Sequence, residues 1–306
     1  MKNEQEASTG VLIEIQRFCL HDGPGIRTTV FFKGCPLRCR WCANPESQQH
    51  VPQIQFISSN CIGCGNCISV CPVQAVKGER GKAVNFCPEK CITCQRCVPE
   101  CAGRALKVSG KRWSLEELVQ EVMKDQVFFR EGGGVTFSGG EVLSQAVFAE
   151  KLAGALHEKG IHITCETCGF SGHEEFQKLL DWCDLLYLDI KHWEEEKHVE
   201  GTGKSRKIIL EHLKMAVEAG IPMAVRIPVI PDYNDSDEDG HGFGVMLREY
   251  GVRQVHLLPF HQFGAAKYRQ LGRAYEYDDY KAVTEEELEP FARVLKSYIP
   301  NVRIGG

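Results

Sequence analysis

The hydrophobic positions of the chain change their rhythm along its length. From about residue 111 onward, short apolar runs typical of buried strands alternate with longer segments in which apolar residues recur at helical spacing. The predicted strands are 26–33, 135–138, 161–165, 185–190, 223–229 and 253–258, and the predicted helices are 114–128, 144–159, 173–180, 206–219, 236–250 and 285–298. Six repeats of a strand and a helix predict an α/β fold in which a parallel sheet curls into a partial (β/α)6 TIM-like barrel.

Residues 53–110 interrupt this alternation. They are rich in Cys, Gly and Pro and contain no helical pattern of useful length. We interpret them as a small inserted domain, so that residues 1–52 and 111–306 form the two parts of the barrel.

Composition and charge narrow the class of protein. The chain has 306 residues, of which 43% are hydrophobic and 25% charged, which is ordinary for a globular protein. No apolar run of membrane-spanning length occurs, and charged residues are spread through the first 20 positions, so we expect neither a membrane span nor a secretory signal. We therefore expect a cytoplasmic protein. The formal net charge of −5 gives no basic footprint for nucleic acid.

Cysteine is the most informative residue type. Of the 16 cysteines, 12 fall between positions 35 and 101. In a cytoplasmic chain such thiols stay reduced and are available as metal ligands or catalysts.

The first group of cysteines is Cys35-x3-Cys39-x2-Cys42, directly after the first predicted strand. Three thiolates leave one iron of a four-iron cluster without a protein ligand. An open iron can bind a substrate, by the logic that separates catalytic from structural zinc sites. The alternative is a zinc site completed by a nearby histidine such as His50.

Two further cysteine runs lie inside residues 53–110 and match the bacterial ferredoxin spacing C-x2-C-x2-C-x3-C. In two-cluster ferredoxins the fourth cysteine of each run serves the other cluster. This rule predicts the ligand sets Cys61, Cys64, Cys67, Cys101 and Cys91, Cys94, Cys97, Cys71. Cys87 is a ninth thiol that can replace one of these. Clusters with four cysteine ligands can relay electrons, support the fold or dock a partner.

Polar residues follow the predicted strands at their carboxyl ends. In parallel α/β architectures these ends meet at one mouth, where ligands bind. The residues at or near these ends are Gly139, Gly140, Glu141, Glu166, Thr167, Asp189, Lys191, Arg226 and His261. Five successive strands therefore direct polar groups toward one site.

The Cys-x3-Cys-x2-Cys group with Trp41 before its last cysteine resembles the radical S-adenosylmethionine (SAM) enzymes. More specifically, two segments resemble the glycyl radical enzyme activating enzymes of the pyruvate formate-lyase activating type: His21-Asp22-Gly23-Pro24-Gly25-Ile26-Arg27 and Ser138-Gly139-Gly140-Glu141. The resemblance covers nearly the whole chain. It implies an oxidoreductase that cleaves SAM reductively into methionine and a 5′-deoxyadenosyl radical, which removes hydrogen from a backbone glycine of a partner enzyme.

The resemblance also implies roles for residues at the mouth. Trp41, Gly139, Gly140 and Glu141 are cofactor-binding residues by this resemblance, with the glycine backbone approaching SAM. Lys191 contacts the SAM carboxylate. Residue type alone allows a simpler alternative for each: Gly139-Gly140 would be an ordinary turn, and Asp189 and Lys191 would be an ion pair at a strand end.

Glu166, Thr167 and Asp189 correspond to residues that hold a monovalent cation beside the SAM carboxylate. Oxygen-rich ligation suits a hard cation. The family more often has Asp-Thr where this chain has Glu166-Thr167. The implied cofactors are three [4Fe-4S] clusters, SAM and a monovalent cation.

Three further residues have implied roles at the substrate side. Arg226 resembles a residue that meets SAM or the incoming peptide, and His261 resembles one beside the adenosyl group. Asp22 resembles a contact to the backbone of the target glycine. The structural alternatives are a core histidine for His261 and an ordinary Asx turn for Asp22.

The implied partners are a glycyl radical enzyme and, as electron donor, a flavodoxin or ferredoxin; we expect an anaerobic, monomeric protein. Other readings are a radical SAM enzyme acting on a small molecule or peptide, an activator of anaerobic ribonucleotide reductase, and a non-catalytic iron–sulfur electron carrier. The partner's own reaction stays open between pyruvate formate-lyase-type chemistry, dehydration, C–N or C–S cleavage and arylacetate decarboxylation.

Overall fold

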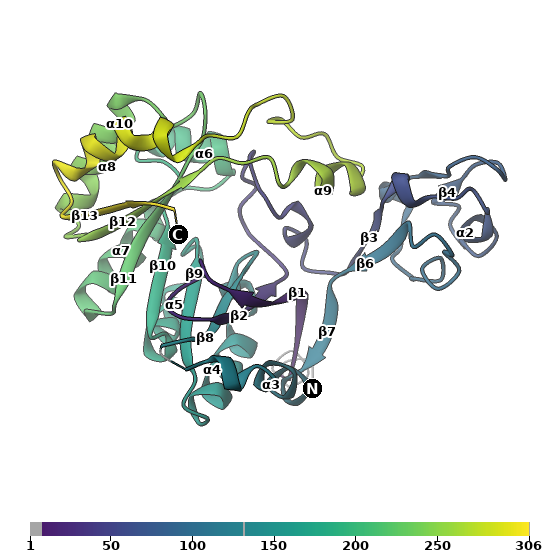
Figure 1. Cartoon of the computed structure of the whole chain (residues 1–306), viewed down its shortest axis with the longest axis horizontal. Helices are drawn as coiled ribbons and strands as arrows, with labels where there is room; N and C mark the ends of the chain where they lie inside the picture. Colours follow the sequence, from purple (N-terminus) through teal and green to yellow (C-terminus); the bar gives the residue numbers. More distant parts are fainter. Residues whose placement is uncertain (1–7, 131, 306) are drawn as a thin grey trace.

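The computed structural model describes residues 8–130 and 132–305. Figure 1 shows a larger body of strands and helices and a smaller lobe beside it, joined through β3, β6 and β7. The outer ends of the predicted domains, at residues 1–7 and 306, lie outside the described residues.

One nine-stranded sheet forms the body, in the order β13-β12-β11-β10-β9-β8-β2-β1-β7. Seven neighbouring strands are parallel: β2 (Arg27–Phe32), β8 (Gly134–Gly139), β9 (His162–Thr167), β10 (Leu185–Asp189), β11 (Met223–Val229), β12 (Gln254–Pro259) and β13 (Asn301–Ile304). At one edge β1 (Thr9–Cys19) and β7 (Lys111–Ser114) add antiparallel strands. All six predicted strands are confirmed. β13 and β7 form the two edges of the sheet.

Helices cover one face of this sheet. They are α3 (Leu115–Met123), α4 (Ala146–His157), α5 (His173–Trp182), α7 (Lys207–Ala219), α8 (Asp237–Glu249) and α10 (Glu285–Lys296). The core lies between them and the sheet: Val135 and Phe137 of β8 are fully buried in it, while Thr136 and Ser138 alternate to the other face. One face of the sheet is therefore apolar and covered by helices, and the opposite face carries polar side chains.

Several elements differ from the sequence expectations. The strands β1 and β13, the helices α6 (Glu195–Thr202) and α9 (Ala265–Gln270), and the return of the chain to the main sheet as β7 were not predicted. The predicted helix 114–128 is shorter: α3 ends at Met123, and a 3₁₀ turn covers Gln126–Phe128. Its start is as expected, because Ser114 and Glu117 form a reciprocal capping box.

The smaller lobe contains two short sheets and one short helix. β3 (Gln53–Phe56) pairs with β6 (Leu106–Ser109), β4 (Val76–Lys77) pairs with β5 (Asn85–Phe86), and α2 spans Asn66–Ser69. Its small core includes Ile54, Val76 and Leu106. The chain changes from this lobe to the main sheet between β6 and β7.

The described part of the chain contains no helix with the length and apolar character needed to cross a membrane.

Candidate active site

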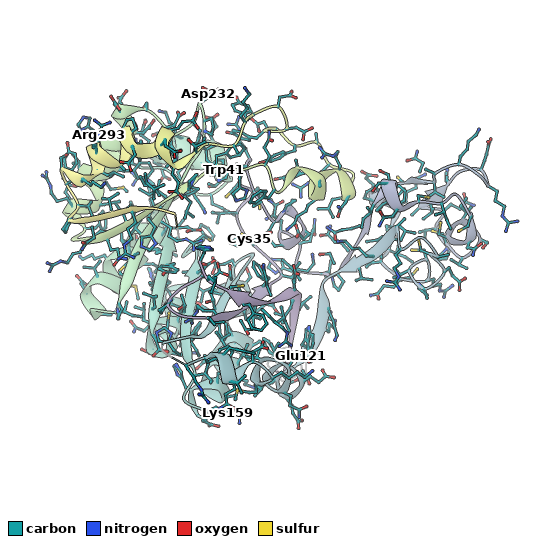
Figure 2. The ribbon with its side chains drawn as sticks, in the orientation of Figure 1. Cys35, Trp41, Glu121, Lys159, Asp232 and Arg293 are labelled. Carbon is teal, nitrogen blue, oxygen red and sulfur yellow. The ribbon has the colours of Figure 1, made fainter. Side chains whose placement is uncertain are left out.

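A cavity of about 260 Å³ opens at the carboxyl ends of the parallel strands. Figure 2 shows Cys35 and Trp41 in the middle of the molecule, above the strands of the sheet. Among the residues predicted for the site, the cavity is lined by Cys35, Cys39, Trp41, Cys42, Gly139, Gly140, Glu166, Thr167, Asp189, Lys191, Arg226 and His261. The chain thus brings together the first cysteine group and residues that follow or end five successive strands.

The loop that carries the three cysteines is held by the end of α6. The amide of Arg38 donates to the carbonyl of Thr202 (2.7 Å), and that of Arg40 donates to the carbonyl of Gly201 (3.1 Å). The ring of Trp41 packs 4.6 Å from that of Tyr233, centroid to centroid. A side chain at Gly201 would collide with both rings, so this close approach depends on glycine.

The protonation of the three thiols depends on their surroundings. Burial raises the pKa of Cys42 to about 11 and raises that of Cys39 as well. A hydrogen bond from Cys168 lowers the pKa of Cys35. Cys168, which is buried directly after the strand-end pair Glu166-Thr167, also lines the cavity and was not among the residues predicted for the site; its place at a strand end was the available signal. Binding of iron must deprotonate these thiols.

His50, the fourth ligand of the alternative zinc site, does not line this cavity. It lines a different depression together with Lys33. The histidine suggested for a zinc site therefore does not line the cavity with the three thiols.

Four charged side chains and one hydroxyl form a continuous chain of bonds across the cavity. Ser138 Oγ donates to Glu166 Oε2 (2.5 Å), and Arg226 Nη1 donates to Glu166 Oε1 (2.5 Å). Arg226 Nε donates to Asp189 Oδ1 (3.2 Å), and Lys191 Nζ donates to Asp189 Oδ2 (2.8 Å). Ser138 lies on β8, Glu166 on β9, Asp189 on β10 and Arg226 on β11. Lys191 follows the end of β10 by two residues. Their four charges cancel.

The ion pairs affect the pKa values of Asp189, Lys191 and Arg226 more strongly than burial does. Burial alone would raise the pKa of Asp189, but Lys191 and Arg226 lower it overall. Burial would lower the pKa of Lys191 and Arg226, yet the neighbouring carboxylates raise both. Asp189, Lys191 and Arg226 are therefore charged at neutral pH.

Gly139 and Gly140 have a packing reason to be glycine. Gly139 has a φ of +106°, and a Cβ on Gly140 would lie 2.3 Å from the carbonyl oxygen of Gly34, next to Cys35. The amide of Gly140 donates to the carbonyl of Phe32 (2.8 Å). The pair lets the end of β8 lie directly against the cysteine loop.

Glu141 was predicted as a cofactor-binding residue but does not line the cavity. It is fully buried, and it accepts hydrogen bonds from Thr167 Oγ1 (2.6 Å), the amide of Cys168 (2.7 Å) and the amide of Leu143 (3.0 Å). Burial raises the pKa of this carboxyl. The sequence placed Glu141 correctly at a strand end, but its side chain turns beneath the cavity and ties β8 to β9.

Asp22 also lies outside the cavity, in the loop between β1 and β2. Its Oδ2 accepts from Thr29 Oγ1 (2.6 Å), and its carbonyl accepts from Thr136 Oγ1 (2.7 Å). The loop is held by the buried Arg27, which donates to the carbonyl of Pro24 (3.0 Å). Asp22 lines a separate depression of about 310 Å³, and its contact with a target glycine stays a prediction.

The oxygens predicted to hold a monovalent cation are already bonded. Both carboxylate oxygens of Glu166 accept hydrogen bonds, from Ser138 and Arg226. Both carboxylate oxygens of Asp189 accept as well, from Arg226 and Lys191. Thr167 Oγ1 donates to Glu141 and accepts from the amide of Gly169 (2.9 Å). These residues as arranged do not fit a bound cation.

In the smaller lobe the structure brings the ferredoxin-type cysteines together in two sets. One small cavity is lined by Cys61, Cys64, Cys67 and Cys101, and a second by Cys71, Cys91, Cys94 and Cys97. These are the sets expected from the exchange of the fourth cysteine. Cys87 lines neither cavity; its thiol donates to Glu89 Oε2 (3.1 Å).

Comparison with known proteins agrees with this geometry. Residues 82–241 match the Radical SAM superfamily, residues 53–102 match a 4Fe-4S dicluster domain, and residues 21–63 match a 4Fe-4S single cluster domain. A radical SAM methyltransferase from Sphaerobacter thermophilus has a similar fold, with a TM-score of 0.53 at 15% identity, covering 91% of this chain and 66% of that one.

Curated relatives match over almost the whole length. The chain is 40% identical to the trans-4-hydroxy-L-proline dehydratase activating enzyme of Clostridioides difficile, over 97% of this chain and 99% of the relative. It is also 40% identical to the benzylsuccinate synthase activating enzyme of Thauera aromatica, over 97% of this chain and 92% of the relative. The chain belongs to the glycyl radical enzyme activating enzymes of the radical SAM superfamily.

Proposed function

We propose that this chain activates a glycyl radical enzyme by reductive cleavage of SAM in the cavity at the strand ends. One observation carries the proposal: the three cysteines of the first group and the charged strand-end residues line the same cavity. When bound, a [4Fe-4S] cluster would supply the electron that splits SAM into methionine and a 5′-deoxyadenosyl radical. Transfer of one hydrogen atom from the target glycine then gives 5′-deoxyadenosine and a glycyl radical on the partner.

The chain's own residues bind and orient the reactants. Cys35, Cys39 and Cys42 would hold three irons and leave the fourth for the amino and carboxylate groups of SAM. The ammonium group of Lys191 faces the same cavity and suits the SAM carboxylate. No side-chain acid or base is needed, so the contribution of the protein is orientation and exclusion of water.

The polar residues around the cavity have proposed contacts with the rest of SAM and with the peptide. We assign the backbone of Gly139 and Gly140 to the amino-acid end of SAM and His261 to its adenosyl end. Arg226 would meet SAM or the incoming glycine segment. Asp22 would contact the backbone of that segment from its separate depression.

The lobe at residues 53–110 would hold two further [4Fe-4S] clusters, which makes three in the protein. The grouping of eight of its nine cysteines into two cavities supports this number. We propose a flavodoxin or ferredoxin as the electron donor and a monomeric, cytoplasmic enzyme. The identity of the partner stays open, because relatives named for a dehydratase and for a synthase are equally similar to this chain.

Anaerobic reconstitution with iron and sulfide, reduction with dithionite and addition of SAM test the chemistry directly. We expect 5′-deoxyadenosine from the wild type and from Cys19→Ala, which removes a buried thiol outside all three cysteine groups. Cys39→Ala should form none. If the fully iron-loaded wild type forms no 5′-deoxyadenosine, the protein is an electron carrier and the proposal is wrong.

A further inference from the structure

The charged side chains in the cavity leave no oxygen of Glu166 or Asp189 without a donor. Arg226 bridges the two carboxylates, with Nη1 2.5 Å from Glu166 Oε1 and Nε 3.2 Å from Asp189 Oδ1. Ser138 and Lys191 occupy the remaining two oxygens. The side chains of the four charged residues are only 11–16% exposed, so water does not compete strongly for these bonds.

The bridge depends on the length of the glutamate side chain. Arg226 lies on β11, Asp189 on the neighbouring β10, and Glu166 on β9, one strand further along the sheet. Adjacent strands lie about 4.8 Å apart, so Arg226 and Glu166 must span two such intervals. An aspartate at position 166 would withdraw its carboxylate by about 1.5 Å, one C–C bond length, and would lose the contact with Nη1.

Charge balance leads to the same conclusion. Two carboxylates face one guanidinium and one ammonium, so the group is neutral as it stands. A metal cation entering between Glu166 and Asp189 would have to displace a guanidinium that never loses its proton. A hard cation needs several oxygen ligands, and here those oxygens already accept from nitrogen and hydroxyl donors.

We propose that the Arg226 guanidinium occupies the place of a monovalent cation between Glu166 and Asp189, so that this enzyme binds SAM without potassium or sodium. The inference rests on the proposed function in one respect, namely that SAM is the ligand of the cavity. It predicts that shortening Glu166 or removing the guanidinium exposes an oxygen site and makes SAM binding depend on potassium.

The test measures the SAM dissociation constant of the reconstituted protein in potassium, sodium and tetramethylammonium chloride at equal ionic strength, with 5′-deoxyadenosine formation as a second readout. We compare the wild type with Glu166→Asp and Arg226→Met, two independent ways to open the bridge. Glu174→Asp, the same change at an exposed position on α5, is the matched control.

We expect wild type and Glu174→Asp to differ by less than about twofold between the three salts. Glu166→Asp and Arg226→Met should bind SAM at least about fivefold more tightly in potassium than in tetramethylammonium, a usual size for coupled binding. Strong potassium dependence of the wild type overturns the inference, and so do folded, iron-loaded variants that ignore potassium. A protein that binds and cleaves no SAM in any salt refutes the proposed function instead, and the inference with it.

Discussion

Asn234 should control both the stability of the site and its affinity for SAM. It is fully buried in the segment that follows β11. Its Nδ2 donates to the carbonyls of Lys191 (3.1 Å) and Pro228 (2.9 Å), and its Oδ1 accepts from the amide of Ile230 (2.7 Å). Lys191, Pro228 and Ile230 all line the cavity. Asn234 therefore positions its walls without itself lining it.

The expected loss of folding stability follows from the number of hydrogen bonds that the substitution removes. Asn234→Ala removes three hydrogen bonds from buried backbone groups, and at about 1 kcal/mol each the loss is about 3 kcal/mol. This is a large part of the 5–15 kcal/mol that is usual for a folded domain. At about 2 °C per kcal/mol for a chain of this size, the melting temperature should fall by about 6 °C. Displacement of Lys191 should weaken SAM binding by about tenfold, which corresponds to about 1.4 kcal/mol.

The assay is an anaerobic thermal melt of the iron-loaded protein, followed by measurement of the SAM dissociation constant. Asn234→Asp keeps the acceptor but replaces the donors with a buried carboxylate oxygen that faces two carbonyl oxygens, so it should melt at or below the temperature of Asn234→Ala. Asn301→Ala, at an exposed position at the start of β13, is the control. The reasoning fails if Asn234→Ala melts and binds SAM like this control.

Two further predictions concern α6, which holds the cysteine loop. Burial lowers the pKa of His198 to about 4, whereas the unfolded chain takes up this proton near pH 6.5. The contribution of His198 is thus fully present above pH 6.5 and is lost as the pH falls toward 4, by about 2 kcal/mol between pH 7 and pH 5. Because burial also lowers the pKa of His162, His212, His256 and His261, melts should show that the wild type loses about 2 kcal/mol more than His198→Gln over this range. Gly201→Ala would place a Cβ 2.4 Å from the hydroxyl oxygen of Tyr233 and 2.9 Å from the Trp41 ring, whereas a Cβ at Gly154 has no neighbour within 4 Å. Iron content should therefore fall in Gly201→Ala and stay unchanged in Gly154→Ala; equal iron content would show that the loop tolerates the shift.

The order of strands and helices in the body could be predicted because buried parallel strands are short continuous apolar runs between amphipathic helices. The same signal is absent where an element is short or polar. β13 has four residues, two of them exposed. Half of the eight residues of α6 are charged, and this helix is positioned by backbone bonds to the cysteine loop. These elements form because of tertiary contacts that have no counterpart in local pattern.

Most of the cavity lining could be predicted because the carboxyl ends of parallel strands share one edge of a sheet. This rule gives the place of a residue but not the direction of its side chain, which is why Glu141 follows β8 as expected and yet does not line the cavity. Asn234 left no motif, since its partners are backbone groups. The pattern at Glu166 and Asp189 shows oxygen ligands, but only the structure shows that Arg226 reaches both of them.

The proposed activity of this chain is the removal of a hydrogen atom from a glycine of a partner enzyme. The most direct test mixes the reduced, SAM-loaded protein with candidate glycyl radical enzymes, among them a trans-4-hydroxy-L-proline dehydratase and a benzylsuccinate synthase. Each candidate is prepared with ordinary and with α-deuterated glycine. We expect a glycyl doublet in the electron paramagnetic resonance spectrum of the cognate partner, and deuterium from the labelled glycine in 5′-deoxyadenosine. Complete cleavage of SAM without a glycyl signal or deuterium transfer for any candidate would contradict it.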